Sequence, residues 1–161
     1  GTYEFPGADV PATDGNMDVV VEPFTVTVPA GTPAVRLMVT NIGFESYDFT
    51  GAEPDAYTAD VIGAQAEDQT LTLQSGWRYE VVNAAYLAHP FEFINVGMTP
   101  ATDAVLLSQA ATGTLEGDVS VDWFDNGTGT SRFTVSAALM ADVDGYRCSI
   151  HITTMRGSIQ Y

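Results

Sequence analysis

The sequence predicts an all-β fold, an antiparallel β-sandwich of Greek-key type. Three observations support this prediction. Apolar and polar residues alternate in about ten short segments, turn residues separate these segments every eight to twelve positions or so, and helical periodicity is almost absent. The chain has 161 residues, of which 45% are hydrophobic, so it can form one domain with a substantial core.

The N-terminal residues 1–17 contain several glycines, prolines and aspartates and show little periodicity. We therefore expect residues 1–17 to form a linker or tail and residues 18–161 to form the domain. The sequence begins without a basic or apolar leader, so we expect that any export or lipid-anchor segment has been removed. Such a tail would suit a tether to a membrane, although an ordinary frayed terminus has the same composition.

The period-two segments predict the strands. Pro23 interrupts the first segment and requires a bulge or a sheet edge there. The predicted strands lie at 19–28, 35–39, 47–49, 71–73, 77–81, 91–93, 105–109, 119–123, 132–135, a segment ending at 148, and 157–161.

The connections are predicted from turn residues and capping residues. Asp125, Asn126 and Gly127 form a strong hairpin signal. Ser136 is expected to cap a short helix over residues 137–143. Residues 51–68 are acidic and rich in alanine, and they read as a long solvated loop with at most one short strand.

The charge is strongly one-sided. The chain has 21 acidic residues against five arginines and no lysine, and its formal net charge is −16. A basic footprint for nucleic acid is therefore missing. Such a surface suits a protein from a halophilic or marine source, or one that docks a basic partner. No apolar run is long enough to form a membrane-spanning helix.

The candidate site is a metal centre. Cys148 is the only cysteine, and it starts the pattern C-x2-H-x3-M with His151 and Met155. The chain has one other histidine, His89, which opens the segment His-Pro-Phe-Glu-Phe. One thiolate, two imidazoles and a weak thioether are the donors of a blue-copper electron-transfer site. If a strand ends at Cys148, these donors converge at one end of the β-structure.

Cys148 has three other interpretations. A lone cysteine is usually a small buried hydrophobic residue, but the clustering with His151 and Met155 argues against that. A nucleophilic cysteine normally meets its histidine from a distant part of the sequence, whereas His151 lies three positions away. A structural zinc site would favour more cysteines or a carboxylate.

The motif Cys148-x2-His151-x3-Met155, followed by Gly157 and a last short strand, resembles the ligand loop of cupredoxins, the type 1 copper family that includes plastocyanin, halocyanin and azurin. Residues 144–151 are similar to the ligand strand of halocyanin-like proteins of haloarchaea and marine microbes. The resemblance covers about residues 34–161. It implies a single copper ion held by His89, Cys148, His151 and Met155.

The sequence departs from related patterns at three positions. Cupredoxins commonly have a proline where Ile152 stands. The start of the His89 segment is similar to a multicopper-oxidase motif, but Glu92 and Ile94 replace the further histidines. Because the chain has only two histidines, it cannot build a trinuclear oxygen-reducing cluster, and an oxidase is excluded. Pro90 has no N–H and cannot donate a hydrogen bond to the Cys148 sulfur.

The resemblance implies one-electron transfer without enzymatic turnover. Electrons would pass through the exposed edge of His151, and Ile152 would belong to a docking patch for redox partner proteins. We expect a monomer located outside the cytoplasm, because the family is typically exported and a lone cysteine forms no internal disulfide. The alternatives are a copper carrier or store with the same ligands, and a cupredoxin-like structural domain without a redox role.

Overall fold

The computed structural model describes residues 2–5, 8–10, 19–21, 24–27 and 32–161. Its contacts divide the chain into two compact units, residues 1–32 and residues 33–161. The predicted boundary between residues 17 and 18 lies outside the described residues, as do Pro23 and Val28.

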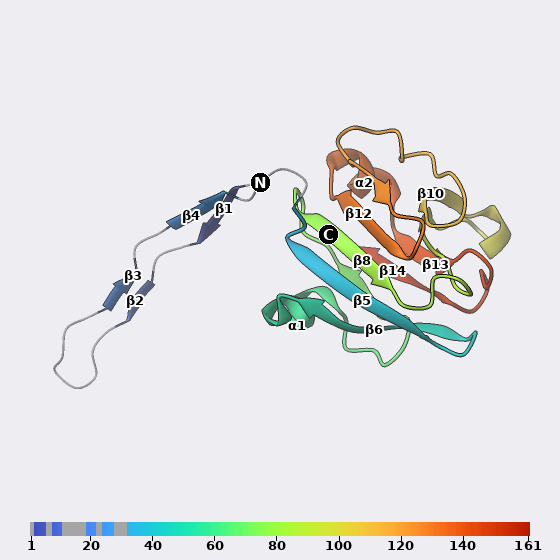
Figure 1. Cartoon of the computed structure of the whole chain (residues 1–161), viewed down its shortest axis with the longest axis horizontal. Helices are drawn as coiled ribbons and strands as arrows, with labels where there is room; N and C mark the ends of the chain where they lie inside the picture. Colours follow the sequence, from blue (N-terminus) through green and yellow to red (C-terminus); the bar gives the residue numbers. More distant parts are fainter. Residues whose placement is uncertain (1, 6–7, 11–18, 22–23, 28–31) are drawn as a thin grey trace. The chain divides into compact units, whose positions relative to one another are not determined.

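The first unit contains two antiparallel strand pairs (Figure 1). Strand β1 (Thr2–Phe5) pairs with β4 (Phe24–Thr27), and β2 (Ala8–Val10) pairs with β3 (Val19–Val21). The predicted strand residues 19–21 and 24–27 thus pair with residues 8–10 and 2–5, for which the sequence predicts a tail.

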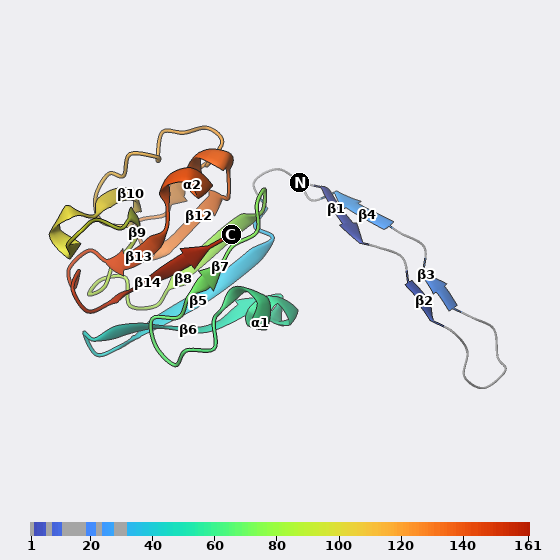
Figure 2. The ribbon, with the colours of Figure 1, turned by 180° about the vertical axis from the view of Figure 1, so that it is seen from behind.

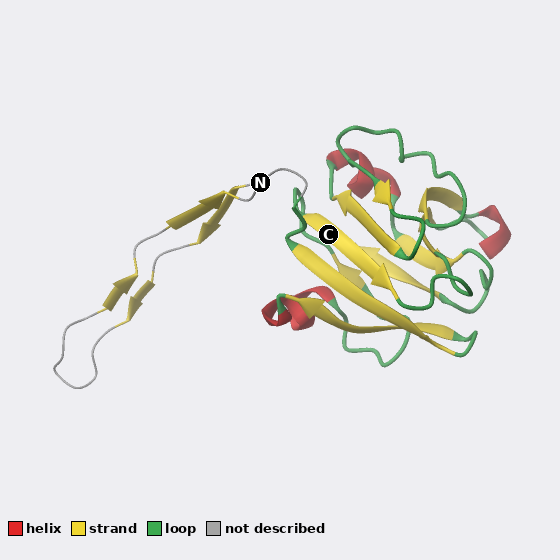
Figure 3. Ribbon diagram, in the orientation of Figure 1, coloured by secondary structure: helices red, strands yellow, loops and turns green. Residues whose placement is uncertain are grey.

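The second unit is mostly β-structure in two five-stranded sheets (Figures 1 and 3). The first sheet has the order β10 (Ala104–Ser108), β9 (Phe91–Asn95), β13 (Gly145–Cys148), β14 (Arg156–Gln160), β7 (Leu71–Thr72). The second has the order β11 (Phe124–Asp125), β12 (Thr130–Thr134), β8 (Arg78–Asn83), β5 (Val35–Ile42), β6 (Ser46–Glu53). The all-β prediction is confirmed, but β7 and β14, and likewise β5 and β8, pair in parallel, so both sheets are mixed.

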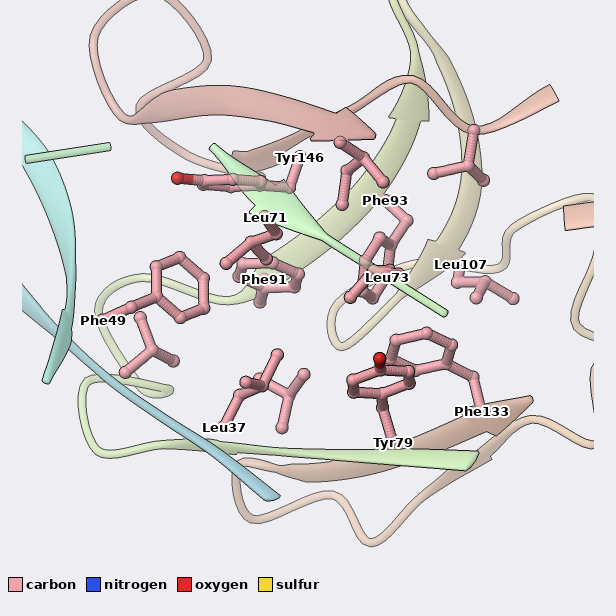
Figure 4. Packing of buried hydrophobic residues seen from close by; sticks show 14 of the residues in the cluster. Leu37, Phe49, Leu71, Leu73, Tyr79, Phe91, Phe93, Leu107, Phe133 and Tyr146 are labelled. Carbon is pink, nitrogen blue, oxygen red and sulfur yellow. The ribbon is translucent and has the colours of Figure 1, made fainter. Parts of the chain in front are cut away.

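The inner faces of the two sheets share one hydrophobic core (Figure 4). Phe93 of the first sheet contacts Phe133 of the second with ring centroids 4.6 Å apart, and Phe91 contacts Phe49 at 6.0 Å. Burying a side chain of this size contributes about 1.5–3 kcal/mol relative to leaving it exposed. The alternation of apolar residues that predicted the strands therefore also defines the core.

One predicted strand is wrong. Residues 119–123 alternate in hydropathy but form turns. The Asp118 carboxylate accepts hydrogen bonds from the backbone N–H and the hydroxyl of Ser120, and Asp122 has a φ of 48°. Both features bend the backbone, since aspartate readily forms such local turns and tolerates the left-handed region. Val121 is nevertheless fully buried.

The predicted short helix is confirmed as α2 (Ala137–Asp142), and the Ser136 hydroxyl accepts a hydrogen bond from the Leu139 N–H at 3.2 Å. The predicted hairpin joins β11 to β12. The long loop over residues 51–68 is instead partly ordered as strand β6, a 3-10 turn (Asp55–Tyr57) and α1 (Thr58–Val61) (Figure 3). A further 3-10 turn spans Pro100–Thr102. None of the helices among the described residues has the length and apolar character needed to cross a membrane.

Candidate metal centre

The C-x2-H-x3-M segment forms a tight loop between β13 and β14. The Cys148 N–H donates to the Met155 carbonyl at 2.9 Å, which continues the antiparallel pairing of the two strands up to the loop. The Met155 N–H donates to the His151 carbonyl at 3.1 Å. These two bonds fix both ends of residues 149–155, hereafter the ligand loop, next to Cys148.

Strand pairing brings His89 to the same place. Cys148 pairs with Phe91 in the first sheet, and the Ser149 N–H donates to the Pro90 carbonyl at 3.0 Å. Figure 2 shows β9, β13 and β14 of this sheet from behind. His89 directly precedes this paired segment, so the sixty residues between the two motifs do not separate them in space.

The backbone of His89 is held by two buried side chains. Its carbonyl accepts hydrogen bonds from the Asn83 amide at 2.8 Å and from the Tyr47 hydroxyl at 2.7 Å. The Asn83 amide also donates to the Gln109 side-chain oxygen, which in turn accepts from the Phe91 N–H. Both sheets therefore help to position His89, since Tyr47 and Asn83 belong to the second sheet.

The donor atoms of three predicted ligands form a compact triangle. The His89 and His151 Nδ1 atoms are 3.1 Å apart, and the Cys148 sulfur lies 3.8 Å from the first and 3.6 Å from the second. A circle through these atoms has a radius of about 2.0 Å, and zinc–nitrogen and zinc–sulfur bonds in proteins are about 2.0–2.1 and 2.3 Å long. The triangle is thus the size that a single bound ion requires.

The Cys148 sulfur also accepts two backbone hydrogen bonds. The N–H groups of Ile150 and His151 each donate to it at 3.4 Å. Pro90 cannot donate, as the sequence predicted, so these bonds come from the ligand loop itself. Hydrogen bonds to a ligand sulfur are one of the means by which a protein adjusts a metal–thiolate centre.

Burial favours the neutral form of His89, which a metal ion requires. The side chain is almost fully buried, and this burial lowers the pKa of His89, with the neighbouring His151 lowering it further. Burial also raises the pKa of Tyr47, and the nearby Cys148 adds to that shift. Tyr47 therefore keeps its proton and remains a donor to the His89 carbonyl.

Met155 is the last residue of the ligand loop. It is fully buried and belongs to the hydrophobic core. Ile152, which stands where cupredoxins commonly have proline, is half-buried, and its carbonyl accepts a hydrogen bond from the Arg156 guanidinium at 3.1 Å.

The solvent side of the site is apolar. The Phe44 ring stacks on the His151 ring with centroids 6.0 Å apart and an interplanar angle of 29°. Phe44 is 64% exposed and Ile150 is 59% exposed, whereas His151 is half-buried. The Thr154 hydroxyl donates to the Phe44 carbonyl, which ties the turn between β5 and β6 to the ligand loop.

Sequence reasoning missed the residues that support the site. The sequence predicts Tyr47 only as a strand residue, and it assigns no role to Asn83 or Phe44. Their role depends on contacts between distant segments, which periodicity does not reveal. The single sequence signal was an asparagine at the end of β8 shortly before His89.

The arrangement can hold one soft or borderline metal ion. Cys148, His89 and His151 lie with their donor atoms within 4.8 Å of one another. One thiolate and two imidazoles suit copper and zinc, whereas magnesium and calcium prefer oxygen ligands. Compared with known proteins, the chain matches no protein-family model, no curated protein and no solved structure.

Proposed function

We propose that this chain is a type 1 copper protein that transfers single electrons between partner proteins. Cys148, His89 and His151 would be its strong ligands and Met155 its weak axial ligand. Copper bound there would alternate between Cu(II) and Cu(I), and no substrate bond would be made or broken.

The observation that carries this proposal is the triangle of one sulfur and two Nδ1 atoms. The donor atoms are separated by 3.1–3.8 Å. Their backbone segments are fixed by strand pairing and by the hydrogen bonds to the His89 carbonyl. A pre-formed site changes little between oxidation states, which is what electron transfer demands and what a rigid scaffold supplies.

The fold supports a Greek-key β-sandwich of cupredoxin type. Two β-hairpin-like pairs, β9 with β10 and β13 with β14, are joined through β9 and β13, and the second sheet packs against them through the shared core. The ligand loop and His89 lie at one end of this arrangement. Sites on loops that a stiff β-scaffold holds in place are common among binding proteins.

The exposed apolar residues support an electron exit beside His151. Phe44 stacks on this ring, Ile150 directly precedes His151, and both are exposed, so we include them with Ile152 in the docking patch. The net charge of −16 favours a basic redox partner and a high-salt environment. We propose a location outside the cytoplasm, in keeping with the lone cysteine.

Titration of the full chain with Cu(II) tests the proposal. We expect one copper per chain, a strong visible absorption band and bleaching by ascorbate. Cys148→Ser should abolish the band, because the colour requires the thiolate. Met155→Leu should keep the colour and change the reduction potential, since the axial bond is weak.

Met98 provides the matched control, because its side chain is fully exposed. Met98→Leu should leave both the band and the potential unchanged. Colour that survives in Cys148→Ser, or a wild-type protein that stays colourless with Cu(II), would refute a type 1 copper centre. Slow electron self-exchange combined with rapid release of copper to an acceptor protein would point instead to a carrier.

A further inference from the structure

We infer that Asp103 is a positioning residue for the metal centre, because its buried carboxylate joins the two arginines at the ends of the ligand loop. Asp103 with Arg147 and Arg156 is called the Asp103 clamp below. Arg147 directly precedes Cys148, and Arg156 directly follows Met155. This inference rests on the proposed metal function, but it makes a separate prediction about the metal-free protein.

The contacts of the clamp are short and buried. The Asp103 Oδ2 atom lies 3.0 Å from Arg147 Nη1 and 3.1 Å from Arg156 Nη1. The Asp103 side chain is 0% exposed, and those of Arg147 and Arg156 are 10% and 23% exposed. Charged groups so far from water are costly unless they are paired with good geometry, so these three residues fix one another's positions.

The clamp belongs to a polar row on the outer face of the first sheet. Successive side chains of a strand point to opposite faces, so Arg147 lies outside while Cys148 points into the core. Arg147 Nε donates to Glu92 of β9 at 2.9 Å, and Ser108 of β10 donates to the same carboxylate at 3.0 Å. The row therefore fixes the register of β9 and β13, and that register brings His89 to Cys148.

The segment that supplies Asp103 covers this row. Residues 96–103 connect β9 to β10, and the Pro100 carbonyl accepts a hydrogen bond from Arg147 at 2.8 Å. The other Asp103 oxygen accepts from the Gly97 N–H at 2.9 Å. A Cβ atom at Gly97 would overlap the backbone of Thr102, so this segment is folded closely on itself.

The clamp also reaches the ligand loop directly. Arg156, held by Asp103, donates to the carbonyl of Ile152, the residue after His151. The carboxylate of one connecting segment thus acts on Cys148 through Arg147 and on His151 through Arg156. Neither arginine lies among the candidate metal donors, so the effect on the metal is one of position.

Asp103→Asn tests the clamp, because it removes the negative charge with little change of shape. Residues that orient metal ligands typically change metal affinity by about 10–100-fold when they are replaced. We expect Cu(II) to bind about 10–100-fold more weakly, measured by competition with a chelator of known affinity. In the metal-free protein, the Cys148 and Met155 amides should exchange with solvent about tenfold faster.

Glu80→Gln is the matched control. Glu80 is also a buried carboxylate between two arginines, but it lies on the second sheet and contacts no residue of the ligand loop. It should leave copper affinity and the absorption band at wild-type values, and it should speed ligand-loop amide exchange no more than its loss of overall stability does. Equal changes in both variants would mean that Asp103 acts only through overall stability.

Arg156→Gln keeps the test decisive if Asp103→Asn does not fold, because Arg156 is more exposed and Asp103 keeps Arg147. It should weaken copper binding to a smaller degree and speed exchange at Met155. Wild-type affinity and exchange in both variants would overturn the inference. If the wild-type protein binds no copper, the proposed function fails, while amide exchange still decides whether the clamp holds the loop.

Discussion

The two sheets of the second unit each carry a buried carboxylate between two arginines, and the two sites differ in what surrounds them. On the second sheet, Glu80 of β8 pairs with Arg36 and Arg132, whose side chains are 49% and 38% exposed. On the first sheet, Asp103 pairs with Arg147 and Arg156, which are far less exposed. The arginine side chains of the ion-pair site are thus partly exposed to water on the second sheet and largely shielded from it on the first.

The difference shows how burial changes the role of an ion pair. The Glu80 carboxylate is buried, but the side chains of Arg36 and Arg132 remain partly exposed to water, so the three charges mainly hold three neighbouring strands together. Around Asp103, water has little access, and the charges must keep a single arrangement. The Asp103 clamp, the less exposed of the two sites, is also the one whose arginines are adjacent in sequence to the candidate metal ligands Cys148 and Met155.

Asp103→Asn should have the largest effect on stability. Asp103→Asn removes the carboxylate that pairs with Arg156, whereas Arg147 keeps its ion pair with Glu92. Removing one partner of a buried ion pair typically costs about 3–5 kcal/mol. We expect a loss of that size in the free energy of unfolding of the metal-free protein, measured with a chemical denaturant. A loss below about 1 kcal/mol would show that the clamp behaves like a solvent-exposed ion pair.

Glu80→Gln should cost less. Its guanidinium partners remain partly hydrated when the carboxylate is lost, so about 1.5–3 kcal/mol is expected, the value of hydrogen bonds to charged groups. The same denaturation experiment applies. If Glu80→Gln proved more destabilising than Asp103→Asn, exposure of the arginines would not be what separates the two sites.

Acid should weaken the Glu80 site in the wild-type protein. Burial alone would raise the pKa of Glu80, but hydrogen bonds and charge from Arg36 and Arg132 outweigh it and lower this pKa in the folded state. The contribution to stability is then complete above the unfolded-state pKa of about 4.3 and is lost as the pH falls through the lower folded-state value. Melting temperatures between pH 6 and 3 should fall less steeply in Glu80→Gln than in the wild type.

The exposed pair next to Glu80 should matter least. Arg36 also contacts Glu53 at 2.9 Å, and both side chains are about half exposed. Such surface pairs are usually worth about 0–1 kcal/mol. We expect Glu53→Gln to change the free energy of unfolding by less than about 0.5 kcal/mol, and added salt should reduce even this difference.

The sequence predicted the candidate ligands better than their supports. Cys148, His151 and His89 could be found because the chain has one cysteine and two histidines, and their spacing has a chemical meaning. Asp103 could not be found in this way. It is one of 21 acidic residues, and its position between two arginines depends on the fold of the segment that follows β9.

The fold class followed from local alternation, but the sheets did not. The parallel pairing of β5 with β8 joins segments about forty residues apart, and the alternation within either strand does not specify the direction of its neighbour. Val121 shows that alternation can predict the burial of a side chain correctly where no strand forms. Its burial follows the predicted pattern, yet its backbone is in turns, because burial needs only the side chain to reach the core.

The five arginines have a last consequence for encounters with other molecules. Each of them forms an ion pair with a carboxylate of its own chain, so every guanidinium charge is paired within the protein. A cationic protein that approaches from solution is attracted by the surplus carboxylates and meets little repulsion. Its association should accordingly be fast in dilute buffer and slow down steeply as the ionic strength rises.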